Sequence, residues 1–77
     1  MSQSTADVTI HIDETLDHSR LTGVAGSLRE VKGVVSVTSH EDKPHLMVIV
    51  YDPEQTTSSA LLEVVTGQGY HAELIGL

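Results

Sequence analysis

The longest apolar run in the chain covers residues 45–51 and ends at Asp52-Pro53. The run is short, rich in β-branched residues and bracketed by Pro44 and Pro53, so it predicts a strand rather than a helix. Because the run is almost continuously apolar, this strand is expected to be covered on both faces, with Tyr51 packing beneath the helices. In so small a domain the chain's own helices cover one face, and the other face meets solvent or a partner.

The remaining patterns predict three more strands and two helices. The strands cover residues 8–12, 34–39 and 70–75, and Val35 and Val37 are expected to face inward in the second of them. The helices are indicated by apolar residues spaced three or four apart: Leu21, Val24, Ala25, Leu28 and Val31, then Ala60, Leu61, Val64 and Val65. Thr15, Asp17 and Ser19 are alternative caps for the first helix, which is expected to end at residues 32–33.

The order of elements is strand, helix, strand, strand, helix, strand. This order predicts an α+β, ferredoxin-like βαββαβ sandwich, in which two helices cover one face of a four-stranded antiparallel sheet. The first and third strands are expected to lie side by side, running parallel, in the middle of the sheet. Residues 1–7 are expected to form a frayed tail, and residues 8–77 a single domain.

Composition narrows the functional classes. The chain has 77 residues, no cysteine and a formal net charge of -7, with only four Lys or Arg side chains. Disulfides and thiolate metal sites are therefore excluded, and nucleic acid and anionic membranes are not expected as partners. The polar start of the chain does not resemble a signal peptide, and no run reaches transmembrane length, so the expected location is the cytoplasm.

Enzyme chemistry finds little support in the sequence. An acylphosphatase on this architecture needs a catalytic asparagine, and the chain contains no asparagine. There is also no glycine-rich phosphate loop and no supported Ser-His-Asp pattern. The protein is therefore expected not to be an enzyme.

Several segments together resemble the heavy-metal-associated domains of copper chaperones and metal-transporting ATPases. The matching segments are VTIHI at residues 8–12, VAGSLREVKGV at 24–34, VIVYDP at 48–53 and GYHAEL at 69–74. The resemblance covers about residues 8 to 75 and implies the same fold and a role in metal handling. That family binds metal through a Cys-x-x-Cys motif before the first helix, whose positions fall on Asp17 and Arg20 here. Because neither residue is a thiol, carriage of soft Cu(I) is not expected.

The first candidate metal site is the loop before the first helix. It contains three carboxylates and one imidazole within six residues: Asp13, Glu14, Asp17 and His18. Such ligands suit a hard or borderline divalent ion such as Co, Ni, Zn or Mn. The alternative is a solvated acidic loop that stabilises the N-terminus of the helix through the helix dipole.

The second candidate metal site lies on the sheet face opposite the helices. If the first and fourth strands are neighbours, His11 and His71 face each other across the pair, with Glu73 nearby. This set would suit Zn, Ni or Cu(II). Alternatively, the imidazoles only cover the sheet. His40 and His45, which flank the hairpin between the second and third strands, are interpreted as turn residues.

The same open face is expected to carry an apolar row formed by Leu46, Val48, Val50 and Ile75. Such a row in water would reduce the solubility of a small protein, so it predicts an interface with a second copy or another protein. A dimer would also bring histidines from two chains together. The alternative is that scattered aliphatic residues are tolerated on the sheet.

Two functions remain open at this point. The first is a non-enzymatic, heavy-metal-associated-like domain that binds or carries a divalent transition metal through His and carboxylate ligands. The second is an interaction module that kept the fold, lost the metal, and self-associates or docks through the open sheet face.

Overall fold

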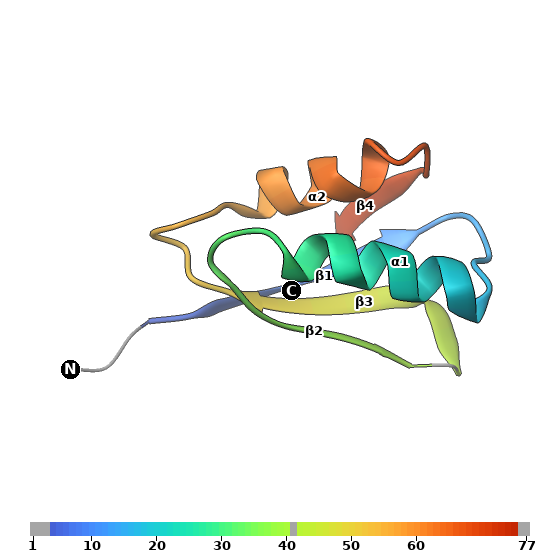
Figure 1. The fold of residues 1–77 in the computed structure, drawn as a ribbon, viewed down its shortest axis with the longest axis horizontal. Helices are drawn as coiled ribbons and strands as arrows, with labels where there is room; N and C mark the ends of the chain where they lie inside the picture. The colour runs from blue at the N-terminus through green and yellow to red at the C-terminus, as the bar shows by residue number, and fades with distance from the viewer. Residues whose placement is uncertain (1–3, 41, 76–77) are drawn as a thin grey trace.

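The computed structural model describes residues 4–40 and 42–75 and has the expected order of elements. These are β1 (Ala6–Ile12), α1 (His18–Arg29), β2 (Val34–His40), β3 (Lys43–Tyr51), α2 (Ser58–Thr66) and β4 (Ala72–Ile75). Both helices lie on one face of a single sheet (Figure 1), which confirms the ferredoxin-like α+β prediction. In the part of the chain described, neither helix is long and apolar enough to cross a membrane.

The first strand begins earlier than its alternating pattern indicates. β1 starts at Ala6, which pairs with Tyr51, so two residues assigned to the expected tail belong to the sheet. Residues 1–3 of that expected tail, and residues 76–77 at the other end, lie outside the described residues.

The strands follow the order β2-β3-β1-β4, and each neighbouring pair is antiparallel. β1 and β3 therefore lie side by side in the middle of the sheet, as expected. The prediction that they run parallel is wrong. α1 returns the chain so that β2 runs in the direction of β1, and the hairpin that follows reverses this direction in β3.

The two middle strands have one face that is buried beneath the helices and one face that the helices leave open. Met47 and Ile49 of β3 are fully buried beneath the helices, as are Ile10 and Ile12 of β1. The residues of β3 that alternate with Met47 and Ile49 are only half-buried, because they point away from the helices: Leu46, Val48 and Val50. The helices therefore cover one side of the apolar strand, as predicted, and the cover expected on its other side stays a prediction.

The edge strand β2 departs from the expected alternation. Its register with β3 shifts between Val34, which pairs with Tyr51, and Ser36, which pairs with Val50. Val35 is the extra residue of this bulge and is 64% exposed, so its predicted inward position is wrong. Val37 and Tyr51 are buried, as predicted.

The first helix is shorter than its apolar stripe suggests. Asp17 is its N-cap, and the Asp17 carboxylate accepts a hydrogen bond from the backbone N–H of Arg20 at 2.9 Å. The helix ends at Arg29, before the predicted end, and the chain turns at Gly33 with φ +100°. A Cβ on Gly33 would lie 2.7 Å from the Cβ of Gln55, so both backbone conformation and space require glycine there.

A short strap ties the loop after β1 to the segment before β4. The Glu14 carboxylate accepts hydrogen bonds from the His71 backbone N–H at 2.9 Å and from His71 Nδ1 at 2.7 Å. The Asp13 backbone N–H donates to the His71 carbonyl oxygen at 2.8 Å. The hydrogen bonds from His71 lower the pKa of Glu14, and the Glu14 carboxylate raises the pKa of His71.

These opposite shifts predict a pH window for the strap. The His71 contribution to stability is complete below its ordinary pKa of 6.5 and is lost as the pH rises through the raised value. The Glu14 contribution is present above its ordinary pKa of 4.5 and is lost as the pH falls through the lowered value. We therefore expect Glu14→Gln, which retains an acceptor oxygen, to destabilise the protein more at about pH 5.5 than at about pH 8.5. Urea unfolding at both pH values measures this difference, and an equal loss at both would show that the charged pair contributes nothing.

The difference in burial between the two faces of β3 leads to a second prediction. Ile49→Ala should lower the free energy of unfolding by about 2–5 kcal/mol, because it leaves a cavity in a fully buried position. Val50→Ala, on the open face of the same strand, should cost about 1 kcal/mol or less. Urea denaturation followed by circular dichroism compares the two variants, and equal losses would contradict the one-sided core.

Candidate metal site

The end of β1 places His11 on the open face of the sheet. Residues opposite one another in antiparallel strands share a face, and His11 lies opposite Leu46 of β3 and Glu73 of β4. Its neighbours along the strand, Ile10 and Ile12, fill the core on the other side. The burial of these two isoleucines therefore fixes the direction of the His11 side chain.

His11, Asp13 and Glu73 converge at this end of the sheet. One ligand atom from each residue lies within 4.8 Å of the other two. His11 Nδ1 lies 3.4 Å from Asp13 Oδ1. Among the side-chain nitrogen and oxygen atoms of the described residues, His11 Nδ1 is the one that is buried without a hydrogen-bond partner. A nitrogen beside the Asp13 carboxylate is satisfied either by carrying the ring hydrogen and donating it to that carboxylate or by binding a cation that the two groups share.

The distance between His11 Nδ1 and Asp13 Oδ1, 3.4 Å, is long for a direct hydrogen bond. In a tetrahedral zinc site with bonds of about 2.0–2.1 Å, neighbouring ligand atoms are about 3.4 Å apart. The separation between His11 Nδ1 and Asp13 Oδ1 already has this value. Asp13 is 63% exposed and Glu73 is also exposed, so rotation of their side chains can bring the third ligand into place.

A second imidazole supports the ring of His11. The rings of His11 and His45 stack with their centroids 5.8 Å apart and their planes 20° apart. His45 Nδ1 lies 2.8 Å from the carbonyl oxygen of Ile12, so Nδ1 carries the hydrogen and donates it. The other nitrogen lies 3.5 Å from Thr15 Oγ1. His45 thus joins the start of β3 to the end of β1, and is more than the turn residue predicted from the sequence.

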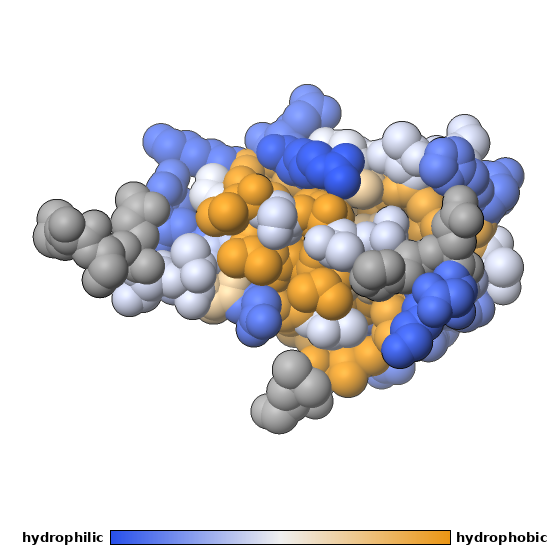
Figure 2. Space-filling model, turned by 90° about the horizontal axis from the view of Figure 1, so that it is seen from below, coloured by the Kyte–Doolittle hydropathy of each residue, from blue (hydrophilic) through white to orange (hydrophobic). Residues whose placement is uncertain are grey.

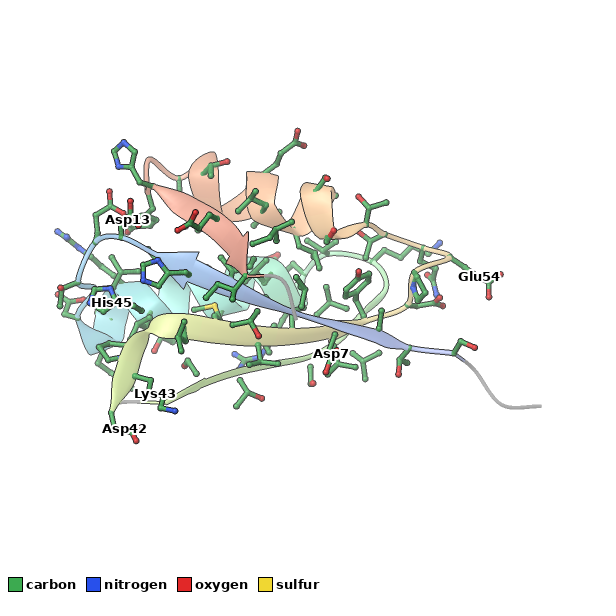
Figure 3. The ribbon with its side chains drawn as sticks, turned by 180° about the vertical axis from the view of Figure 1, so that it is seen from behind. Asp7, Asp13, Asp42, Lys43, His45 and Glu54 are labelled. Atoms are coloured by element: carbon green, nitrogen blue, oxygen red, sulfur yellow. The ribbon has the colours of Figure 1, made fainter. Side chains whose placement is uncertain are left out.

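Figure 3 shows this region in relation to the whole sheet. Asp13 and His45 lie together at one end, whereas Asp7 and Glu54 lie toward the opposite end. A shallow hollow opens beside the cluster, and its lining residues are Asp13, Thr66, Gly69, Tyr70, His71, Ala72 and Glu73. Because Asp13 and Glu73 line this hollow, these two candidate ligand residues are open to solvent.

The structure brings together two of the six residues predicted as metal ligands, His11 and Asp13. The other four lie elsewhere: Glu14 and His71 form the strap, Asp17 caps α1, and His18 is the exposed first residue of that helix. The predicted pairing of His11 with His71 is wrong by two residues in register. His71 precedes β4, and its carbonyl oxygen accepts from the Asp13 backbone instead.

The sequence placed Glu73 only near the predicted pair of His11 and His71, whereas the structure places Glu73 directly opposite His11. Alternation places His71 and Glu73 on the same face of the last strand, so the pattern alone does not select between them. The choice depends on the register between β1 and β4, which in the structure pairs His11 with Glu73.

The predicted apolar row occupies the open face beside this cluster. Leu46, Val48 and Val50 are half-buried, and Ile75 is 36% exposed. Figure 2 shows hydrophobic residues gathered over the middle of this face, with hydrophilic residues around them. His40 lies at the end of β2, where its backbone pairs with Lys43.

Comparisons with known proteins add the following. Neither a protein-family model nor a curated protein sequence matches the chain. Among solved structures, the chain is similar to oxidised MerP from Ralstonia metallidurans CH34, with 19% identity, a TM-score of 0.84, and coverage of 95% of this chain and 100% of that one.

Two further solved structures have the same architecture. One is the N-terminal domain of a potential copper-translocating P-type ATPase from Bacillus subtilis in its Cu(I)-loaded state, with 20% identity, a TM-score of 0.84, and coverage of 95% of this chain and 90% of that one. The other is the yeast copper transporter domain Ccc2a, with 18% identity, a TM-score of 0.81, and coverage of 91% of this chain and 94% of that one. The chain therefore has the fold of the heavy-metal-associated domains.

Proposed function

We propose that the protein is a non-enzymatic domain that binds a divalent transition metal at His11, Asp13 and Glu73 and hands it on. The observation that supports this most directly is the buried, unpartnered Nδ1 of His11, which lies 3.4 Å from the Asp13 carboxylate. One nitrogen and two oxygen ligands suit Zn(II), Co(II), Ni(II) or Cu(II). Without thiolates, Cu(I) is not the expected cargo.

The fold supports a metal-handling role, although the ligands differ from those of its structural neighbours. The Bacillus subtilis domain is described in a Cu(I)-loaded state, and the present chain has no cysteine. At the positions that correspond to the family's thiols, the Asp17 carboxylate accepts from the Arg20 backbone and serves as a helix cap. We therefore infer that metal binding here uses the end of β1 and the facing residue of β4.

The number of ligands indicates exchange rather than permanent retention. Structural zinc sites are closed by four protein ligands, whereas the cluster offers three. The remaining position is open to water or to an incoming ligand. An ion held in this way is accessible from the hollow beside Asp13 and Glu73, which fits a protein that delivers metal.

Protein docking through the open sheet face is the second candidate function. The half-buried Leu46, Val48 and Val50 and the exposed Ile75 favour it, because they place an apolar row on the face that no helix covers. On this alternative the chain would bind a partner without any requirement for metal.

Titration of the untagged apo protein with Zn(II) and Co(II), followed by calorimetry and by Co(II) absorption, tests the metal proposal. We expect saturable binding with a defined stoichiometry. His11→Ala and Glu73→Gln should each weaken it by about tenfold or more, because each removes one of three ligands. Asp17→Asn should retain both the helix cap and the affinity, since asparagine also caps helices well.

The control separates this cluster from general binding of cations to an acidic chain. If Asp17→Asn and Glu73→Gln weakened binding equally, the affinity would reflect net charge rather than the three ligands. A flat calorimetric trace with Zn(II), Co(II), Ni(II) and Cu(II) would contradict the proposed function.

A further inference from the structure

We propose that the open face of the sheet binds a basic, amphipathic helical segment of another protein. This inference rests on the second candidate function, docking through the open face, and it names the chemistry of the partner. Three features of the face support it: the order of its apolar and acidic residues, its size, and the state of the two edges of the sheet.

Strand pairing arranges the open face in three rows. Side chains that lie opposite one another, or two residues apart along a strand, share a face. From the start of β1 to its end, the rows are Asp7 with Val50, then Ile75, Thr9 and Val48, then Glu73, His11 and Leu46. The apolar row therefore runs through all three, and Figure 2 shows hydrophobic residues over the middle of the face with hydrophilic residues around them.

Acidic residues stand at both ends of β1 on this face. Asp7 is exposed at one end, and Asp13 and Glu73 are exposed at the other (Figure 3). The four Lys and Arg residues stand outside the three rows, on α1, in the turn after it and at the start of β3: Arg20, Arg29, Lys32 and Lys43. A partner that covers the apolar row thus meets carboxylates at both ends. Lys or Arg side chains complement these carboxylates, and the net charge of -7 attracts a basic partner from a distance.

The dimensions of the face suit a single helix. Asp7 and Asp13 are six residues apart, which corresponds to about 20 Å along the strand. About 13 residues of helix span this length, and a helix about 10–12 Å wide covers two or three strands. The four strands together cover roughly 400 Å², whereas a stable interface between globular proteins buries about 800 Å² on each side. A short segment that binds reversibly therefore fits this face better than a folded domain.

The edges of the sheet are less suited to an extended segment. A peptide that adds a strand needs a continuous series of free backbone groups along an edge strand. On β2, the bulge at Val35 interrupts that series, and the Val37 carbonyl oxygen already accepts a hydrogen bond from Arg29 Nη2 at 3.1 Å. On the other edge, β4 has four residues. The partner is therefore expected to lie across the face and not along an edge.

Three synthetic peptides of about 14 residues test the inference on the apo protein in EDTA. The first has Leu residues at helical spacing flanked by Lys, the second has the same composition in an order without an apolar stripe, and the third has Gln in place of Lys. Fluorescence anisotropy measures the affinity of each, and NMR amide shifts locate the bound peptide. We expect the first peptide to bind about tenfold more tightly than the other two, with shifts in β1, β3 and β4.

Matched double variants separate the face from the net charge. Asp7→Asn with Glu73→Gln removes two carboxylates from the open face. Glu54→Gln with Glu63→Gln removes two exposed carboxylates from the loop after β3 and from α2, so the overall charge of the two proteins is equal. The first pair should weaken binding of the Lys peptide by about fivefold, because two ion pairs are lost, and the second pair by about twofold or less.

The other outcomes separate this inference from the function on which it rests. Equal effects of the two double variants would show that the peptide responds to net charge alone, and would overturn the inference. Equal binding of the Lys and Gln peptides at β1 and β3 would overturn the basic partner and leave docking through the open face standing. Amide shifts confined to α1 and α2, or no binding of any peptide, would overturn both, whereas the titration with Zn(II) tests the metal site independently.

Discussion

The register of β1 against its two neighbours is the constraint on which the rest of the structure depends. Ile10 and Ile12 must both face the helices. A slip of one residue in the register of β1 would expose these two side chains to solvent and bury Thr9 and His11. The cost of such a slip holds the strand in place. His11 is thereby held on the open face between Leu46 and Glu73. The placement of the candidate metal cluster is thus a consequence of the hydrophobic core.

The parts of the cluster differ in how firmly they are held. His11 and Glu73 stand on paired strands, and the ring of His11 is further supported by its stack on His45. Asp13 follows β1, but its backbone donates to the His71 carbonyl oxygen, and the adjacent Glu14 fastens the loop to the same residue. The strap and the histidine stack therefore limit how far His11, Asp13 and Glu73 can separate from one another. Preorganisation of this kind reduces the ordering that an ion must impose.

The sequence was sufficient for the element order and for the burial of one face of β3 beneath the helices, because these depend on local periodicity and on burial. It did not predict the bulge that exposes Val35, since a bulge depends on pairing with the neighbouring strand rather than on the strand's own pattern. The prediction that His71 lies opposite His11 was wrong for the same reason: His71 and Glu73 share a face by alternation, and only the register between β1 and β4 selects Glu73. Asp17 illustrates a different difficulty. A carboxylate before a helix suits a metal and a cap equally well, and the hydrogen bond to the Arg20 backbone shows that it caps the helix.

Anomalous diffraction from crystals grown with Zn(II), measured on both sides of the zinc absorption edge, tests the central claim most directly. The account predicts one strong anomalous peak at the open face, within bonding distance of His11, Asp13 and Glu73. A peak at Glu14, Asp17 or His18 instead, or no peak near His11, would contradict it.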